Sequence, residues 1–148
     1  MVACGVPFLH RLSVAAADAD DLGHANNTVF VRWIQEAAVA HSAAVGFDLS
    51  AYRARGAVFV VRRHELEYLL PAFPGEALDV ETRVTGFTPA TSTRQTRILR
   101  ARDGALLAHG TTQWAYVDLS RGRPLRIPAE VRSRFPVEPP VGEERAQE

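Results

Sequence analysis

The chain carries its densest group of chemically active side chains in one short segment, residues 18–27, with the sequence DADDLGHANN. Carboxylates, a histidine and two asparagines lie close together there, and a hydrophobic segment follows directly. Side chains of these types can act as a base, a nucleophile or a hydrogen-bond donor. If the following segment is a helix, its free N–H groups and positive dipole end lie at the same place and can polarise a carbonyl group.

The segment that follows, residues 28–45, has the hydrophobic spacing of a helix. Asn26 or Asn27 is the expected N-cap, because asparagine accepts a hydrogen bond from the free N–H groups of the first turn. Gly46 is a suitable stop at the other end. The hydrophobic face consists of Phe30, Trp33, Ile34, Ala37, Ala38, His41 and Val45.

The rest of the chain reads mainly as strands. A first strand precedes the loop at residues 8–16, and a short helix is expected at 50–55. Consecutive antiparallel strands follow, with Asp103-Gly104 as a hairpin turn, and Pro128 opens a short helix that extends through Phe135. Val58 to Val61 are all apolar and predict a strand end buried on both faces. The expected class is α+β, with the long helix on one face of an antiparallel sheet. The predicted later strands are 58–70, 78–85, 91–102 and 106–119.

Length and composition set the outer limits. We expect one domain at residues 1–135 and a disordered tail, rich in proline and glutamate, at 136–148. The formal net charge is zero, which argues against a nucleic-acid partner. The single cysteine, Cys4, forms no internal disulfide and is expected to be inert. Without a signal peptide or a long apolar run, we expect a cytoplasmic protein with no membrane contact.

The loop and helix contain the pattern Asp20-x-x-Gly23-His24-x-Asn26-Asn27-x-x-Phe30-x-x-Trp33-x-x-Glu36-Ala37. This pattern resembles the acyl-CoA thioesterases of the hotdog fold, and the 4-hydroxybenzoyl-CoA thioesterase-like family in particular. The resemblance extends over about residues 8–128. It implies a hotdog fold, a homodimer whose sheets join or a homotetramer built from such dimers, and active sites at the subunit interface.

The resemblance also assigns roles within the loop. Asp20 falls at the position of the family's catalytic aspartate, which acts as nucleophile or general base on the thioester. Asn27 falls at the first residue of the helix, whose backbone N–H polarises the thioester carbonyl. His24 is either a base, donor or orienter of water, or a packed loop histidine. Asn26 is a structural hydrogen bonder or a contact to the substrate carbonyl. From the residues alone, turn formation is the favoured interpretation of Asp18, Asp20 and Asp21. With the motif, Asp20 is the expected catalytic residue, and Asp18 and Asp21 keep the structural interpretation.

Further candidates lie outside the loop. Glu36 either reaches a site across the interface or is buried and paired with an arginine. For the substrate we expect the strand at Val60 and Val61 to bind the pantetheine arm. Arg62 and Arg63 are candidates for the nucleotide phosphates, with Arg94 and Arg97 behind them. The alternative for each arginine is a solvated side chain or an ion pair with Glu65, Glu67 or Glu81.

One departure from the family pattern bears on the substrate. The 4-hydroxybenzoyl-CoA enzyme carries a basic cluster between its third and fourth strands, where this chain has Thr-Pro-Ala-Thr at residues 88–91. An acyl-carrier-protein thioester, which has no adenosine, is therefore a substrate candidate beside acyl-CoA. Four aromatic residues suggest either an acyl pocket or part of the core: Phe30, Trp33, Phe59 and Tyr68.

Other chemistries have less support. We expect no metal and no cofactor, because the segment lacks a full ligand set and the chain has no phosphate-binding glycine loop. A hotdog hydratase or dehydratase would use His24 and Glu36, but its proline-rich histidine loop is missing. A non-catalytic acyl-thioester-binding protein would have no need for Asp20. The leading hypothesis is an acyl thioesterase.

Overall fold

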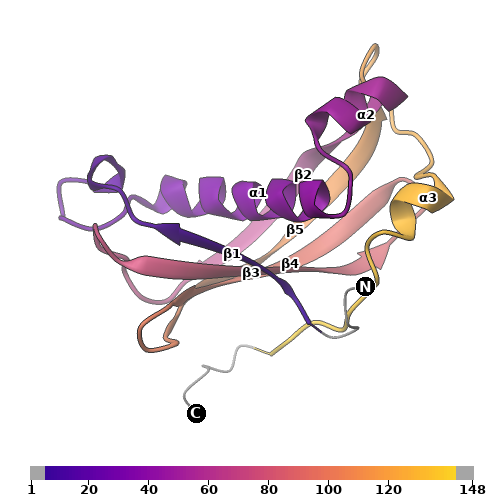
Figure 1. The fold of residues 1–148 in the computed structure, drawn as a ribbon. Helices are drawn as coiled ribbons and strands as arrows, with labels where there is room; N and C mark the ends of the chain where they lie inside the picture. The colour runs from indigo at the N-terminus through magenta and orange to yellow at the C-terminus, as the bar shows by residue number, and fades with distance from the viewer. Residues whose placement is uncertain (1–5, 143–148) are drawn as a thin grey trace.

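The computed structural model describes residues 6–142 of the chain, so Cys4 lies outside the described residues. Its fold is α+β: a long helix, α1, lies on one face of a five-stranded antiparallel sheet, as in the hotdog fold (Figure 1). The predicted class is therefore confirmed. The elements are β1 (Phe8–Ser13), a short 3-10 turn (Ala16–Asp18), α1 (Asn27–Ala44), α2 (Leu49–Arg55), β2 (Ala57–Tyr68), β3 (Ala77–Phe87), β4 (Thr91–Arg100), β5 (Leu106–Asp118) and α3 (Ala129–Arg132).

The strand order in the sheet is β1-β3-β4-β5-β2. Strands β3, β4 and β5 form the predicted meander, whereas β2 pairs with β5 and not with its sequence neighbour β3. Within residues 6–142, β2 has no strand on its outer side. The prediction that Val58 to Val61 are buried on both faces is wrong, because these residues lie on this edge strand and are half-buried or exposed.

Helix α1 holds the sheet through its apolar face. Phe30, Trp33 and Ile34 are almost fully buried and pack in one cluster with Leu78 and Ile98 of the sheet. Burial of side chains of this size contributes about 1.5–3 kcal/mol each. The helix stops at Gly46, whose φ of 98° lies in the region that glycine adopts without a steric penalty.

The two ends of α1 have different surroundings. The polar loop precedes its N-terminus at one end of the molecule, and α2 and α3 lie at the other end (Figure 1). A second apolar cluster fills that far end and includes Phe47, Tyr52, Val131 and Phe135. The fold therefore separates a polar end from an apolar end along a single helix.

The segment after α3 follows the sheet. Helix α3 is shorter than the predicted 128–135, and Pro128 is its N-cap. The N–H of Glu138 donates to the carbonyl oxygen of Val84 at 2.9 Å, and the N–H of Val141 donates to Gln95 Oε1 at 2.7 Å. Residues 136–142 of the expected disordered tail are thus hydrogen-bonded to the sheet, and residues 143–148 lie outside the described part. No described helix has the length and apolar character required to span a membrane.

Candidate active site

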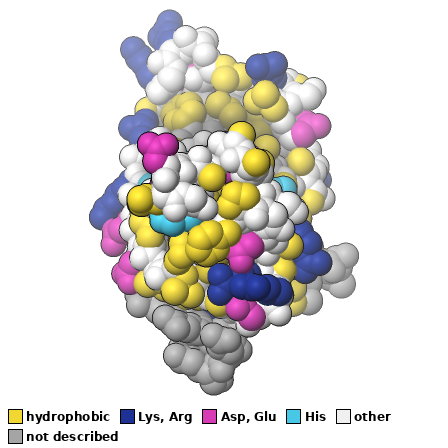
Figure 2. Space-filling model, turned by 90° about the vertical axis from the view of Figure 1, so that its left-hand side faces the viewer, with side chains coloured by type: hydrophobic (Ala, Val, Ile, Leu, Met, Phe, Trp, Pro, Cys, Tyr) yellow, Lys and Arg dark blue, Asp and Glu magenta, His cyan; other side chains and the backbone are white. Residues whose placement is uncertain are grey.

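The loop before α1 is a tight turn closed by its own backbone. The N–H of Asp20 donates to the carbonyl oxygen of His24 at 2.9 Å, and the N–H of Gly23 donates to that of Asp20 at 3.0 Å. Gly23 has a φ of 84°, so a side chain at this position would be strained. The turn brings Asp20 and His24 together at the polar end of the molecule. Figure 2 shows this end, where histidine, acidic and hydrophobic side chains share the surface.

The Asp20 carboxylate is both a turn former and an accessible group. Its Oδ1 accepts the N–H of Leu22 at 2.9 Å and lies 4.0 Å from Nδ1 of His24. The side chain is 27% exposed. No hydrogen bond or ion pair of Oδ2 is found among residues 6–142, so this oxygen is available for water or a substrate. The structural interpretation of Asp20 and the chemical one are therefore compatible.

The helix start lies directly beside this turn. Asn26 is the N-cap, and its Oδ1 accepts from the N–H of Thr28 at 2.9 Å and from its hydroxyl at 2.8 Å. Asn27 is the first helical residue. Its carbonyl oxygen accepts the Tyr68 hydroxyl at 3.1 Å. No acceptor for the Asn27 N–H is found in the described part of the chain, as expected for a first-turn amide.

A buried carboxylate anchors the loop to the helix. Asp18 is 7% exposed and accepts the N–H of Ala15 at 3.0 Å and Nη2 of Arg32 at 2.9 Å. Burial acts to raise the pKa of Asp18, but the hydrogen bonds from Arg32 and Ala15 outweigh it and hold the pKa below its usual value. The N–H of Asn26 donates to the Asp18 carbonyl oxygen at 3.0 Å. Asp18 is therefore structural, as predicted.

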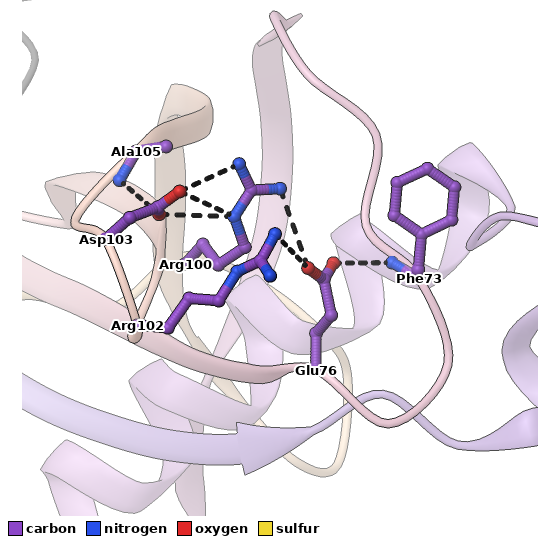
Figure 3. A network of polar contacts seen from close by, with 6 residues as sticks. All are labelled: Phe73, Glu76, Arg100, Arg102, Asp103 and Ala105. Atoms are coloured by element: carbon purple, nitrogen blue, oxygen red, sulfur yellow. Dashed lines mark hydrogen bonds and ion pairs between the residues drawn. The ribbon is translucent and has the colours of Figure 1, made fainter.

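The loop between β2 and β3 supports the turn from outside. The N–H of Ala25 donates to the carbonyl oxygen of Ala72 at 2.7 Å, and the Phe73 ring meets the His24 ring edge-on at 6.2 Å. Glu76 Oε1 accepts the N–H of Phe73 at 2.8 Å, and its other oxygen lies 3.6 Å from two arginines. Figure 3 shows this network, which continues to Asp103 and Ala105. The two arginines are Arg100 and Arg102.

The helix candidate, Glu36, lies away from the turn. It is nine residues beyond Asn27, or about 13 Å at 1.5 Å per residue. Its side chain is 45% exposed and pairs with Arg32 at 3.2 Å. The prediction of an arginine partner is confirmed, but burial is not.

The expected substrate strand lies on β2. Val60, Val61, Arg62 and Arg63 lie along this edge strand, and the pairing with β5 shifts register between Val61 and Arg63. Arg63 is exposed and pairs with Glu65 at 3.0 Å, which matches the alternative interpretation.

Two arginines are not available to a nucleotide. Arg94 is 6% exposed and Arg97 9% exposed, and Arg97 pairs with Glu81 at 3.0 Å. Their placement behind Arg62 and Arg63 as phosphate contacts is therefore wrong. Strand alternation turns Arg94 toward α1, where its guanidinium reaches His41.

Two aromatic residues lie beside the loop and the helix start, and one of them, Phe73, was not among the residues predicted from the sequence. Tyr68 and Phe73 are 41% and 43% exposed, and both contact the loop or the helix start. Tyr68 is one of the aromatic residues that the sequence predicts to form either an acyl pocket or part of the core. The cluster Pro-Ala-Phe-Pro-Gly at 71–75 signals a turn, but nothing in it indicates that this turn packs against His24. Within residues 6–142, no group of three or more potential metal ligands is close enough to hold an ion.

Comparison with known proteins gives a consistent picture. A sequence model of the thioesterase-like superfamily matches residues 14–135. A structure of a hypothetical protein from Thermus thermophilus is 27% identical, with a TM-score of 0.79, and the match covers 86% of this chain and 95% of that one.

Two further solved structures are similar in fold. A hypothetical protein from Aquifex aeolicus is 23% identical, with a TM-score of 0.82 over 88% of this chain and all of that one. A 1,4-dihydroxy-2-naphthoyl-CoA thioesterase from Synechocystis is 20% identical, with a TM-score of 0.79 over 86% of this chain and 93% of that one. Among curated proteins, no sequence gives a significant match.

Proposed function

The chain belongs to the thioesterase-like superfamily, and from this premise we propose that it hydrolyses an acyl thioester to a free acid and a thiol. The observation that carries the proposal is the position of Asp20 beside the first turn of α1. An accessible carboxylate oxygen and a helix N–H without an acceptor occur within one short loop. These are the two groups that attack at a thioester carbonyl requires: a base or nucleophile, and a donor to the carbonyl oxygen.

Asp20 acts in one of two ways. As a general base, it takes a proton from water while the water oxygen bonds to the carbonyl carbon. The C–S bond then breaks, and the leaving thiolate takes the proton. As a nucleophile, Asp20 displaces the thiolate itself and forms a mixed anhydride, which water then hydrolyses. In both routes the negative charge that develops on the carbonyl oxygen is stabilised by the Asn27 N–H and the helix dipole.

The other loop residues support these two groups. His24, 4.0 Å from Asp20 Oδ1, orients the water or keeps the carboxylate in place. Asn26 is the N-cap that fixes the start of α1. It directly precedes Asn27, the proposed donor, and is therefore a candidate for a contact to the substrate carbonyl. Tyr68 and Phe73 are exposed aromatic rings beside the loop, and they offer a surface for the acyl group or for the pantetheine arm.

The substrate proposed is an acyl-CoA or an acyl-carrier-protein thioester. One similar structure, from Synechocystis, is described as a thioesterase for an aromatic acyl-CoA. For this chain we propose that the outer edge of β2, at Val60 and Val61, receives the pantetheine arm, with Arg62 and Arg63 near the phosphates. We further propose a homodimer or homotetramer in which Glu36 of one subunit approaches the site of another. Sedimentation equilibrium measures that assembly directly.

The first test measures thiol release from short, long and aromatic acyl-CoAs with Asp20→Asn and its neighbour Asp21→Asn. Asp21 is exposed, and no contact of its side chain is found among residues 6–142. Loss of general-base catalysis lowers rates by about 10²–10⁴-fold, so Asp20→Asn should fall by that amount and Asp21→Asn should keep the wild-type rate. Equal rates in both variants, with equal thermal unfolding, would exclude the proposed role of Asp20.

The second test removes the Asn27 N–H alone. Proline is well tolerated at the first helical position, and Asn26 already has the extended backbone (φ −62°, ψ 142°) that suits a residue before proline. Asn27→Pro should therefore fold and lose about 10²–10³-fold in kcat, whereas Asn27→Ala keeps the N–H and its activity. Full activity in a folded Asn27→Pro variant would refute the assigned donor. Saturable binding of acyl-CoA without any turnover by the wild type would favour a binding protein instead.

A further inference from the structure

A second concave site lies at the opposite end of α1, where the candidate active site has no residue. A cavity of about 100 Å³ lies between the C-terminal half of α1, α2 and the sheet. Two of its lining residues, Val39 and Leu49, are more than half exposed, so the cavity opens to the surface there. Its inner wall is mainly apolar and includes Ala38, Phe59, Val84, Trp114 and Phe135.

Among the described residues that line this wall, the charged one is a buried arginine. Arg94 on β4 is 6% exposed, yet it lines the cavity. One of its nitrogens, Nη1, donates to Nδ1 of His41 at 2.9 Å and to the Thr82 hydroxyl at 3.1 Å. The guanidinium also lies over the Phe135 ring at 5.4 Å. A guanidinium has five N–H donors, so most of its hydrogen-bonding capacity is not used by these neighbours.

Arg94 has no ion-pair partner in the described part of the chain. Among residues 6–142 no carboxylate forms an ion pair with it, whereas Arg83 and Arg97 both pair with Glu81. Burial lowers the pKa of Arg94 to about 10, with Tyr52 acting in the opposite direction, so the group is still cationic at neutral pH. A buried charge without a counter-ion is costly, and a bound anion would remove that cost.

The protein groups around the guanidinium cannot serve as that anion. Because arginine only donates, Nδ1 of His41 must accept, so His41 is neutral with its proton on Nε2. Burial first, and the charge of Arg94 second, lower the pKa of His41 to about 4. Thr82 is a hydroxyl. In addition, the buried indole N–H of Trp114, another cavity residue, has no acceptor in the described part of the chain.

This cavity is distinct from the proposed thioester site of the same protomer. Ala38 and Ser42, both in its lining, follow Asn27 by 11 and 15 residues. At 1.5 Å per residue they lie roughly 17–22 Å further along the helix axis. An acyl group held at Asp20 by a short chain does not extend that far.

We propose that this cavity binds a short apolar carboxylic acid, with the carboxylate paired to Arg94 and the hydrocarbon part against the aromatic and aliphatic wall. A planar carboxylate matches two parallel guanidinium N–H groups. The size of the cavity limits the size of the ligand. A cavity of about 150 Å³ accepts benzene, so a cavity of about 100 Å³ suits a short hydrocarbon chain. Any part of the ligand that does not fit inside extends toward the opening. The proposal does not depend on thioester hydrolysis.

The test compares each acid with its neutral amide of the same shape. Butyrate and benzoate, and then butyramide and benzamide, are titrated into the wild-type protein by calorimetry and by tryptophan fluorescence. The variants are Arg94→Met, which keeps the side-chain length without the charge, and Ala38→Leu, which fills the cavity and keeps Arg94. Arg53→Met, on the exposed surface of α2, is the matched control.

We expect an acid to bind at one site per chain and its amide to bind at least tenfold more weakly. Arg94→Met and Ala38→Leu should lose tenfold or more in affinity for the acid, whereas Arg53→Met should bind it like the wild type. Equal binding of acid and amide, unchanged binding by folded Arg94→Met, or no binding of any acid would overturn the proposal.

Discussion

Acidification should destabilise this protein through His41, and the size of that residue's effect follows from its surroundings. The ring is 8% exposed, stacks on Phe8 at 5.0 Å and meets the Phe135 ring edge-on at 5.2 Å. Its Nδ1 accepts from Arg94, so protonation would break that hydrogen bond and place two cations together. These causes lower the pKa of His41 from 6.5 to about 4 in the folded chain.

The sign and the pH window follow from this shift. The folded-state pKa is depressed, so between pH 6.5 and about 4 the unfolded chain binds a proton that the folded chain does not. The stabilising contribution of neutral His41 is fully present above pH 6.5 and is lost as the pH falls to about 4. At about 1.4 kcal/mol per pKa unit, the loss is roughly 3 kcal/mol, a large part of a typical free energy of unfolding.

The assay is urea unfolding of the wild type and of His41→Gln at several pH values from 7.5 to 4. Glutamine offers an amide oxygen to Arg94 but does not titrate. The difference in free energy of unfolding between the two proteins should therefore be constant above pH 6.5 and shift by roughly 3 kcal/mol toward the variant as the pH falls to 4. Equal m-values show that the same transition is compared. Parallel stability curves over this range would refute the reasoning.

Three further predictions concern the support of the candidate site and the sheet. Asp18→Asn should lower the free energy of unfolding by about 2 kcal/mol, because it weakens a buried hydrogen bond to Arg32; urea unfolding measures this, and an unchanged midpoint would contradict it. Glu76→Ala removes the acceptor for the N–H of Phe73 in the β2–β3 loop, so urea unfolding should show a loss of about 1 kcal/mol in the free energy of unfolding, and the KM for thioesters should rise. An unchanged KM would show that this loop has no contact with the substrate. Gly110→Ala places a methyl group against Leu66 and should cost about 1–3 kcal/mol in thermal or urea unfolding, whereas Gly86→Ala, with open space around it, should cost less.

The elements could be predicted from local patterns, but their pairing could not. The spacing of Phe30, Trp33 and Ile34 places α1 within one residue of its observed ends, because an amphipathic helix needs that spacing to cover a sheet. The pairing of β2 with β5 depends on contacts between segments far apart in the chain. No local periodicity encodes this pairing, and for this reason the prediction that Val58 to Val61 are buried on both faces was wrong.

The candidate site shows the same division. The turn at Asp20, the N-cap at Asn26 and the helix start at Asn27 follow from residues that act on their immediate neighbours. The burial of Arg94 does not, since β4 carries polar residues on both faces and its sequence resembles that of a solvent-exposed strand. The approach of Phe73 to His24 is likewise a tertiary contact without a local signal.

Strand β2 takes part in both ends of the molecule. Tyr68 at its last position holds the start of α1, while Val58 and Phe59 near its beginning line the cavity around Arg94. Because the strand is hydrogen-bonded on one side only among residues 6–142, its outward amides should exchange with deuterium faster than those of β4. A partner chain or ligand that hydrogen-bonded along this edge would slow amide exchange near Tyr68 and near Val58 together. Amide exchange along β2 would then show whether binding at one end of the strand changes the stability of the other end.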